Sequence, residues 1–471
     1  MSVEAPSSVA DLLWAGAAAQ AQALRDRTIR VEELLLLVLE RQARLDPSLN
    51  AFRVVYADAA WPAAEEAQKR LDAGEVTPLL GVPIAIKDDA DVAGDVTAMG
   101  GRPEGPPASA DSESVARLRA AGAIIVGKTN VPERCLWPFT ESLTHGATRN
   151  PWSLDHTPGG SSGGTAAAVA AGIVGVATGS DGGGSIRIPA GFSGLVGIKT
   201  TRGLVPLPGG ERWHGLSVAG PLGRTVADAA AMLDVIADDG SERPAGGAPY
   251  GDAAATDPRP LRIALAWRTP IGPARIDRQR RAAVAETADR LRGLGHDVVE
   301  RELPVGLSEF AQFLVRYLRG GGDDVADLSH PEWLEARSRG VRRLGRLVPD
   351  RLLRWSRDAE AGARARVDRV FDDVDVVLQP GTTGPAFRIG AFHGRGALAT
   401  MLGVATRIPH MQLWNLLGHP VAAVPVGRDD QGLPMGVQFV GPHDSERLLL
   451  SLAGQLERDR PWAQDRPTGL D

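Results

Sequence analysis

Two glycine-rich loops that contain serine lie close together in the middle of the chain. They are GGSSGG at residues 159–164 and GSDGGGSIR at residues 179–187. Because glycine has no Cβ, such loops reach backbone conformations that let several N–H groups converge on one bound atom. The three glycines before Ser185 therefore predict a cradle for an anion with a hydroxyl group at its end. A serine hydroxyl in that position is a candidate nucleophile.

A serine nucleophile needs a base, and the sequence offers a lysine in place of the usual histidine. The nine histidines show no clustered ligand spacing, and with a single cysteine we expect no metal site. Lys87 ends the apolar run of GVPIAIKDD at residues 81–89, so its amine is expected where a buried strand leaves the core. Only four of the 52 basic residues are lysine, and lysine, unlike arginine, can lose its proton on burial.

These residues predict a site that joins Lys87 with Ser161 and Ser185, in which an uncharged amine accepts a serine proton. The alternative from the residues alone is that the glycines only form turns and that the Lys87 amine reaches solvent along the surface.

Two other motif matches fail on their expected structure. Residues 122–129, GAIIVGKT, fit the phosphate-binding pattern G-x-x-x-x-G-K-[ST], but Ala-Ile-Ile-Val is typical of a strand whose N–H groups pair in a sheet. GGSSGG contains the G-x-S-x-G pattern of a nucleophile elbow, which has to follow a strand directly, whereas LDHTP before it is a poor strand sequence. We therefore expect neither a phosphate-binding loop nor an α/β-hydrolase elbow.

Helix and strand patterns alternate along the chain, which predicts an α/β sheet. Residues 131–160 form a long irregular stretch with several aromatic residues and are expected to be functional, and residues 240–259 read as a linker. The helices are expected at residues 8–24, 31–45, 57–74, 165–176, 276–294 and 445–458, and in an arginine-rich region at 307–372. The strands are expected at residues 51–56, 81–89, 123–126, 195–199, 261–267, 296–304, 373–380, 419–427 and 435–441.

The bulk composition excludes several classes of partner. The net charge of −6 gives no reason to expect nucleic acid, and acidic residues interleave with the arginines of residues 307–372, which is typical of a solvated helix face. The N-terminus has no basic region, and no apolar run reaches about 18 residues. The single cysteine, Cys135, rules out an intrachain disulfide. We therefore expect a cytoplasmic protein with no membrane partner.

Three long motifs, GVPIAIKDD, TPGGSSGGTAAAVAAG and GSDGGGSIRIPAGFSGLVGIKTTRG, resemble the amidase signature family. The resemblance is strongest over residues 75–230 and weakest over the variable region of residues 240–400. It returns near the C-terminus in NLLGHPVAAVPVG and GLPMGVQFVG. It implies one amidase domain over residues 1–471, with a mixed, many-stranded central sheet flanked by helices on both faces. It also implies that a homodimer is frequent.

Carried over onto this sequence, the resemblance implies a triad of serine, cis-serine and lysine. Ser185 falls on the nucleophile, Ser161 on the serine that follows a cis peptide bond and relays the proton, and Lys87 on the base. Each N–H donor of an oxyanion hole stabilises the transition state by about 2.7–4 kcal/mol. The resemblance places these donors on Gly182, Gly183, Gly184 and Ser185.

The resemblance also covers positions beside the triad. Ser162, Asp181 and Arg187 fall on motif positions that we interpret as supports for the two loops. The sequence departs from the common pattern at Thr165, where serine is usual, and at Gly182, where a bulkier residue often sits. The second departure puts only the fine geometry of the oxyanion hole in question.

Cys135 falls, by resemblance, on a substrate-binding position that lines the acyl pocket, although an ordinary small buried residue is the equally weighted alternative. We expect Trp213 and Trp414 nearby, which favours an apolar or aromatic substrate.

The resemblance implies an amidase that hydrolyses a small-molecule carboxylic amide through an acyl-enzyme and needs no cofactor. Neutral Lys87 takes a proton from Ser161, which takes one from Ser185, whose oxygen attacks the carbonyl carbon. Two alternatives stay open at this point. One is the glutaminase subunit of an amidotransferase, and the other is a non-catalytic binding scaffold.

Overall fold

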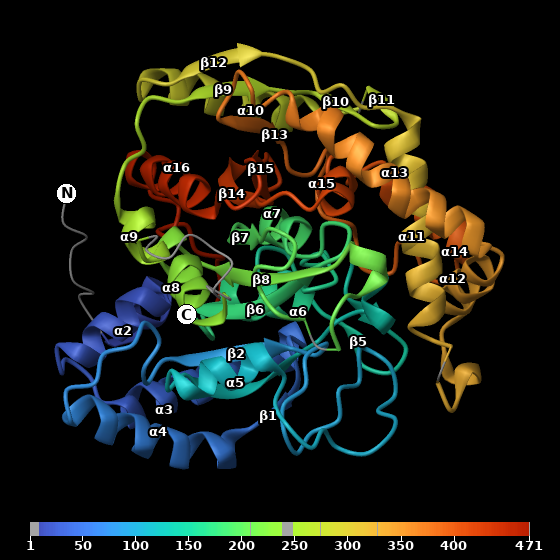
Figure 1. Ribbon diagram of the computed structural model, residues 1–471. Coiled ribbons are helices and arrows are strands. Elements are labelled where there is room, and N and C mark those ends of the chain that lie inside the picture. Colours follow the sequence, from blue (N-terminus) through green and yellow to red (C-terminus); the bar gives the residue numbers. More distant parts are fainter. Residues whose placement is uncertain (1–8, 208, 238–247, 274, 327, 471) are drawn as a thin grey trace.

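The computed structural model describes residues 9–207, 209–237, 248–273, 275–326 and 328–470 (Figure 1). Within these residues the strands are β1 (Phe52–Val55), β2 (Pro83–Lys87), β3 (Ile124–Thr129), β4 (Glu141–Ser142), β5 (Gly146–Ala147), β6 (Val176–Asp181), β7 (Val196–Lys199), β8 (Val218–Gly223), β9 (Arg262–Leu265), β10 (Arg268–Thr269), β11 (Gly272–Pro273), β12 (Asp297–Glu300), β13 (Val376–Pro380), β14 (Val421–Arg428) and β15 (Pro434–Val440).

The α-helices are α1 (Val9–Ala15), α2 (Ala17–Arg25), α3 (Val31–Leu49), α4 (Ala57–Asp72), α5 (Glu113–Ala120), α6 (Gly163–Ala170), α7 (Arg187–Ser193), α8 (Val226–Ile236), α9 (Tyr250–Ala255), α10 (Arg278–Gly293), α11 (Leu307–Asp323), α12 (Ala336–Arg346), α13 (Asp350–Asp368), α14 (Ala397–Ala405), α15 (Gln412–Leu417) and α16 (Glu446–Asp459). Short 3₁₀ turns are η1 (Glu133–Cys135), η2 (Trp213–Gly215) and η3 (Pro331–Trp333).

Among the described residues, eleven strands form one sheet in the order β1-β3-β2-β6-β8-β7-β14-β15-β13-β9-β12. β2 runs parallel to β3 and β6, and β9 runs parallel to β12 and β13, whereas the pairs between β6 and β15 are antiparallel. Helices α6 and α7 pack together on one face, and α8 and α16 pack on the other (Figure 1). This confirms the predicted mixed, many-stranded sheet with helices on both faces.

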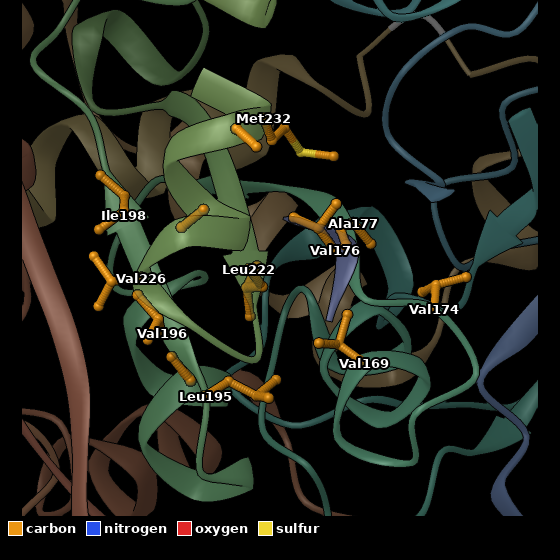
Figure 2. Packing of buried hydrophobic residues seen from close by; sticks show 14 of the residues in the cluster. Val169, Val174, Val176, Ala177, Leu195, Val196, Ile198, Leu222, Val226 and Met232 are labelled. Atoms are coloured by element: carbon orange, nitrogen blue, oxygen red, sulfur yellow. The ribbon is translucent and has the colours of Figure 1, made fainter. Parts of the chain in front are cut away.

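The core around β6, β7 and β8 explains why these strands are apolar throughout. Figure 2 shows Val176 and Ala177 of β6, Leu222 of β8 and the side chains of α8 packed together. Strands that are covered on both faces bury every side chain, so their sequences are apolar runs without alternation. All eight residues of α6 are also buried, which confirms the prediction of a helix of small residues enclosed on all sides.

The structure corrects the length of that helix. α6 ends at Ala170, and Gly172 with φ +65° turns the chain. Residues 176–181, of which only the first lay in the predicted helix, form β6, a strand that the sequence analysis did not predict. β6 lies between β2 and β8, so it brings the second serine loop beside the end of β2.

Two further boundaries differ from the prediction. The helix expected at residues 8–24 is divided into α1 and α2 at Gly16, which has φ +90°. The expected linker at residues 240–259 contains α9, which packs against α8 and α16, while residues 238–247 lie outside the described residues. Within the residues that the structure describes, no helix combines the length and the apolar character that crossing a membrane requires.

The rejection of the phosphate-binding motif is confirmed. Residues 124–129 form β3, whose backbone pairs with β2 on one side and with β1 on the other. Their N–H groups are therefore part of the sheet. The lysine of the motif, Lys128, is fully buried and contacts Asp88 with its Nζ 2.9 Å from Oδ1.

Candidate active site

Lys87 stands at the end of β2, where its amine contacts two serine hydroxyls. β2 and β6 are parallel, with Ala85 opposite Ala177, so the carboxyl ends of both strands lie at the same edge of the sheet. The Nζ of Lys87 lies 2.8 Å from Ser161 Oγ and 2.6 Å from Ser180 Oγ. The Lys87 side chain is only 1% exposed. The amine is therefore held inside the protein and does not reach along the surface to solvent.

The first serine loop packs tightly against the irregular stretch before it. The peptide bond between Gly160 and Ser161 is cis. A Cβ on Gly160 would lie 2.6 Å from the carbonyl oxygen of Trp137, so only glycine fits at this position. The N–H of Ser162 donates to the carbonyl oxygen of Ser185 at 3.2 Å. This hydrogen bond joins the two serine loops.

The second serine loop is built around the carboxylate of Asp181. It accepts hydrogen bonds from the N–H groups of Gly184 at 2.6 Å and Ile186 at 3.2 Å. Its two oxygens also lie 3.0 Å from the Nε and Nη2 of Arg187, and both side chains are fully buried. Burial raises the pKa of Asp181, but the Arg187 guanidinium outweighs burial and holds that pKa well below its usual range.

Arg187 also connects this loop to the C-terminal part of the chain. Its guanidinium donates to the carbonyl oxygen of Met411 at 3.0 Å and to the side-chain oxygen of Asn415 at 2.6 Å. A longer hydrogen bond of 3.3 Å reaches the side chain of Gln438 in β15. Asn415 in turn donates to the carbonyl oxygen of Asp181 at 2.7 Å. The loop conformation therefore depends on α15 and β15.

These contacts leave three of the four predicted oxyanion donors for a ligand. Within the described part of the chain, the N–H groups of Gly182, Gly183 and Ser185 have no hydrogen-bond acceptor. Gly184 is the exception, because its N–H is already bound to Asp181. The structure thus corrects the prediction for Gly184, which holds the loop and does not point to a free acceptor site. The half-buried hydroxyl of Ser185 likewise has no partner among the described residues.

The Lys87 amine has a third contact that the sequence analysis missed. The Oδ2 of Asp89 lies 3.2 Å from Lys87 Nζ and accepts a hydrogen bond of 2.5 Å from the Ser180 hydroxyl. Burial raises the pKa of Asp89, but Lys87, Arg212 and the hydrogen bond from Ser180 together lower it below its usual value. Asp89 is the last residue of GVPIAIKDD and Ser180 opens the second loop motif, so both stood in motifs already singled out.

An aromatic wall lies against the glycines of the second loop. A Cβ on Gly182 would lie 2.8 Å from the ring of Trp213, and a Cβ on Gly183 would lie 3.2 Å from the ring of Phe313. Tyr317 packs between these two rings, with centroid distances of 5.4 Å to Trp213 and 5.9 Å to Phe313. The glycine at 182, where a bulkier residue is common, therefore makes room for the Trp213 ring.

Cys135 lies next to the lysine network. It belongs to η1, and its Sγ is 4.0 Å from Asp89 Oδ2. Burial raises the pKa of the Cys135 thiol to about 11. The thiol is therefore protonated at neutral pH.

The second tryptophan that we expected near the substrate lies elsewhere. Trp414 is completely buried in α15, and its indole N–H donates to the side-chain oxygen of Gln379 at 2.9 Å. It packs in the core between α15 and β13 and is not part of the aromatic wall. Trp213 alone of the two fulfils the expectation.

Three of the four lysines are buried, as their scarcity suggested. Lys87, Lys128 and Lys199 are inaccessible to solvent, whereas the Lys69 side chain is 73% exposed. Lys199 donates to the carbonyl oxygens of His419 at 2.5 Å and Thr200 at 3.0 Å. Burial lowers the pKa of Lys199 well below its usual value. Its two acceptors are backbone carbonyls behind the Asp181 loop, which is a structural position.

The fold and this arrangement of loops match proteins of one family. A sequence model of the family described as Amidase matches residues 33–450. The chain is 53% identical over 97% of its length to AmiB2 of Mycobacterium bovis, a protein provisionally named an amidase, and covers 99% of that relative. It therefore belongs to the amidase signature family and is a hydrolase of amide C–N bonds.

Solved structures of the same fold act on different amides. A 6-aminohexanoate cyclic dimer hydrolase in complex with its substrate superposes with a TM-score of 0.87 at 30% identity, over 98% of this chain and 100% of that one. A bacterial aryl acylamidase of the amidase signature family superposes with a TM-score of 0.85 at 25% identity, over 96% and 98% of the two chains. A more distant relative by sequence belongs to the glutamyl-tRNA(Gln) amidotransferase of Synechococcus sp. (strain WH7803), of which it is one subunit. It is 36% identical, over 95% of this chain and 97% of that one.

Proposed function

We propose that this protein hydrolyses small-molecule carboxylic amides through an acyl-enzyme on Ser185. The observation that carries the proposal is the 2.8 Å hydrogen bond between Lys87 Nζ and Ser161 Oγ, on a loop whose next residue is bound to the backbone of Ser185. A buried amine, a relay hydroxyl and a half-buried serine with no competing partner among the described residues form the parts of a proton relay.

The first half of the reaction forms an ester. Uncharged Lys87 accepts the proton of the Ser161 hydroxyl while Ser161 accepts that of Ser185, and the Ser185 oxygen bonds to the carbonyl carbon of the amide. The carbonyl oxygen becomes an oxyanion and is stabilised by the N–H groups of Gly182, Gly183 and Ser185. The tetrahedral intermediate then collapses. The C–N bond breaks, the leaving nitrogen takes the proton back through Ser161, and the acyl group stays on Ser185.

The second half releases the acid. Water loses a proton to the same relay and attacks the ester carbonyl, and the same N–H groups stabilise the second oxyanion. Collapse of this intermediate breaks the bond to Ser185, whose oxygen recovers its proton. Lys87 is neutral again at the end of the cycle, so the protein acts as a catalyst without an added cofactor.

The surroundings of the loop favour an apolar acyl or amine group. A cavity of about 330 Å³, including the part that is open to solvent, lies between α11 and α15. Its walls include Phe310, Phe313, Pro409 and Leu413. Because Phe313 also borders Gly183, the cavity is adjacent to the catalytic loop. Burying apolar area contributes about 25 cal/mol per Å², so this cavity rewards alkyl or aryl substituents over polar ones.

A substrate panel tests this function. We expect the purified protein to hydrolyse hexanamide, benzamide and acetanilide faster than acetamide, with ammonia or aniline released as the measured product. Glutamine is the diagnostic member of the panel, because the 36% identical relative from Synechococcus is part of an amidotransferase. Turnover of glutamine alone would identify a glutaminase that supplies ammonia to a partner. Turnover of none of the amides would contradict the proposal.

Cys135 provides a test of the acyl pocket, since we propose that it lines the space beside Ser161. With its thiol pKa at about 11, the thiolate fraction near pH 7 is about 300-fold lower than that of an ordinary cysteine, and alkylation by iodoacetamide should be slow and accelerate with pH. We expect the alkylated protein to lose amidase activity because the adduct fills the pocket.

The matched control is Cys135→Ala. The chain has one cysteine, so this variant has no other thiol and should keep its activity through the same treatment. Full activity after complete alkylation of Cys135, measured by mass spectrometry, would remove this residue from the substrate pocket.

A further inference from the structure

Asp89 and Ser180 surround the Lys87 amine on the side away from Ser161. Lys87 Nζ has three close acceptors, Ser161 Oγ at 2.8 Å, Ser180 Oγ at 2.6 Å and Asp89 Oδ2 at 3.2 Å. Ser180 directs its own proton to Asp89 at 2.5 Å, so its oxygen is an acceptor toward the lysine. An ammonium group has three N–H donors, which matches three acceptors. This arrangement therefore suits the protonated form of Lys87.

A protonated lysine cannot act as a base, so the carboxylate has a direct effect on catalysis. An anion within about 4–6 Å of a cationic group favours its charged form. Asp89 is buried, with a side chain that is 9% exposed, which limits screening by water. The carboxylate therefore opposes the loss of the proton that the proposed relay requires.

Other groups that face the pair carry little uncompensated charge. Arg212 faces Asp89 and is itself bound to Asp324 at 3.3 Å, so its positive charge is largely compensated. Cys135 faces the network as a protonated, uncharged thiol. The groups that face Lys87 and Asp89 are thus Arg212, Asp324, Cys135, Ser161 and Ser180. Asp89 is the anion in direct contact with Lys87.

We propose that Asp89 is a positioning residue that, together with Ser180, sets the pH at which Lys87 becomes a base. This inference rests on the proposed function of the Lys87–Ser161–Ser185 relay. In the resting enzyme Asp89 holds Lys87 as an ammonium group. As pH rises, Lys87 gives one proton to water through the small cavity lined by Asp89, Ser180 and Arg212, and its neutral amine then accepts the Ser161 proton. The enzyme is consequently most active in alkaline solution.

The test is the pH dependence of kcat/KM for the best amide of the panel, in the wild-type protein and in Asp89→Asn. The wild-type profile should rise with pH on a single acid limb. Removing the negative charge makes the ammonium form less stable, so Lys87 loses its proton more easily and the midpoint of this limb should move to lower pH. Removal of one adjacent opposite charge corresponds to a shift of about one to three pH units.

Two further variants keep the result interpretable. Asp91→Asn makes the same charge change in the same loop, but its carboxylate binds the hydroxyl of Thr97 and not Lys87, so its midpoint should not move. Should Asp89→Asn fail to fold, Asp89→Ser also removes the charge and retains a hydroxyl for Ser180. A purely structural role of Asp89 would lower the rate at every pH and leave the midpoint unchanged.

The outcomes separate the two proposals. A midpoint that stays within about 0.3 pH units in both Asp89 variants, with activity that still requires Ser185, overturns the role of Asp89 and leaves the relay intact. Activity that persists in Ser185→Ala, or a wild-type profile without an acid limb, overturns the relay itself and the role of Asp89 with it.

Discussion

Replacement of Ser185 by alanine is expected to lower kcat for amide hydrolysis by at least about 10⁴-fold, because no covalent intermediate can form without its hydroxyl. Substrate binding should change little, since the N–H groups of Gly182 and Gly183 are part of the backbone. The rate is measured with the best amide of the panel under saturating conditions. A serine-directed sulfonyl fluoride followed by peptide mapping should place the label within residues 179–187 in the wild-type protein.

The matched control for this variant is Ser193→Ala. Ser193 lies on α7, shortly after the same loop, and its buried hydroxyl donates to the carbonyl oxygen of Pro158 at 3.1 Å. Its loss should reduce stability by about 1 kcal/mol and leave kcat within a few-fold of the wild type. If Ser185→Ala kept a tenth of the activity, or if the label were found on Ser161, a different serine would be the nucleophile.

Replacement of Arg187 by methionine is expected to lower the free energy of unfolding by about 3–5 kcal/mol, because it leaves the Asp181 carboxylate buried without its counter-charge. It also removes the hydrogen bonds to Met411 and Asn415. Urea denaturation at pH 7, followed by circular dichroism, measures the change. The pKa of Asp181 is lower in the folded protein than in the unfolded chain, so the contribution of the pair is complete above about pH 4 and is lost on acidification through the folded pKa.

Arg290→Met is the corresponding surface control. Arg290 lies 2.6 Å from Asp459, and both side chains are partly exposed at 41% and 32%. A pair of this kind contributes about 0–1 kcal/mol. Similar losses of stability for the two variants would show that burial of the Arg187–Asp181 pair has no special importance. A protein that lost no activity with Arg187→Met would further show that the loop keeps its shape without this pair.

The sequence located the lysine and both serine loops because each is marked by local chemistry. Lys87 follows an apolar run that can only be a buried strand, and the glycines before Ser185 have no simpler purpose than an exposed backbone. The site residues Lys87, Ser161 and Ser185 lie on elements that the structure brings to one edge of the sheet. Their catalytic roles stay predictions until the variants are measured.

The finer electrostatics of the site could not be read from the sequence. Asp89 directly follows the predicted strand, yet only the fold decides which of two neighbouring aspartates turns toward Lys87. Asp88 turns away to Lys128 at 2.9 Å, whereas Asp89 contacts Lys87. The occupation of the Gly184 N–H by Asp181 is of the same kind, because it depends on the turn that the loop makes and not on its composition.

The helix boundary and the pocket failed for a different reason. Ala and Val fit a buried helix and a buried strand equally well, so the pattern between residues 165 and 181 did not show where α6 ends and β6 begins. The aromatic wall combines Trp213 with Phe313 and Tyr317, which are about a hundred residues further along the chain. Contacts over such separations leave no periodic signal in a single sequence.

The hydrogen bonds of Arg187 also determine when the site can first exist during synthesis of the chain. Lys87, Ser161 and Ser185 leave the ribosome within the first half of translation, and β2, β3 and β6 can pair as soon as they appear. The partners of Arg187 at Met411, Asn415 and Gln438 are 224, 228 and 251 residues further along. The nascent chain therefore carries its nucleophile for more than two hundred residues of elongation before its loop acquires its final support. An amidase that could attack cellular amides is complete only when the protein is almost finished.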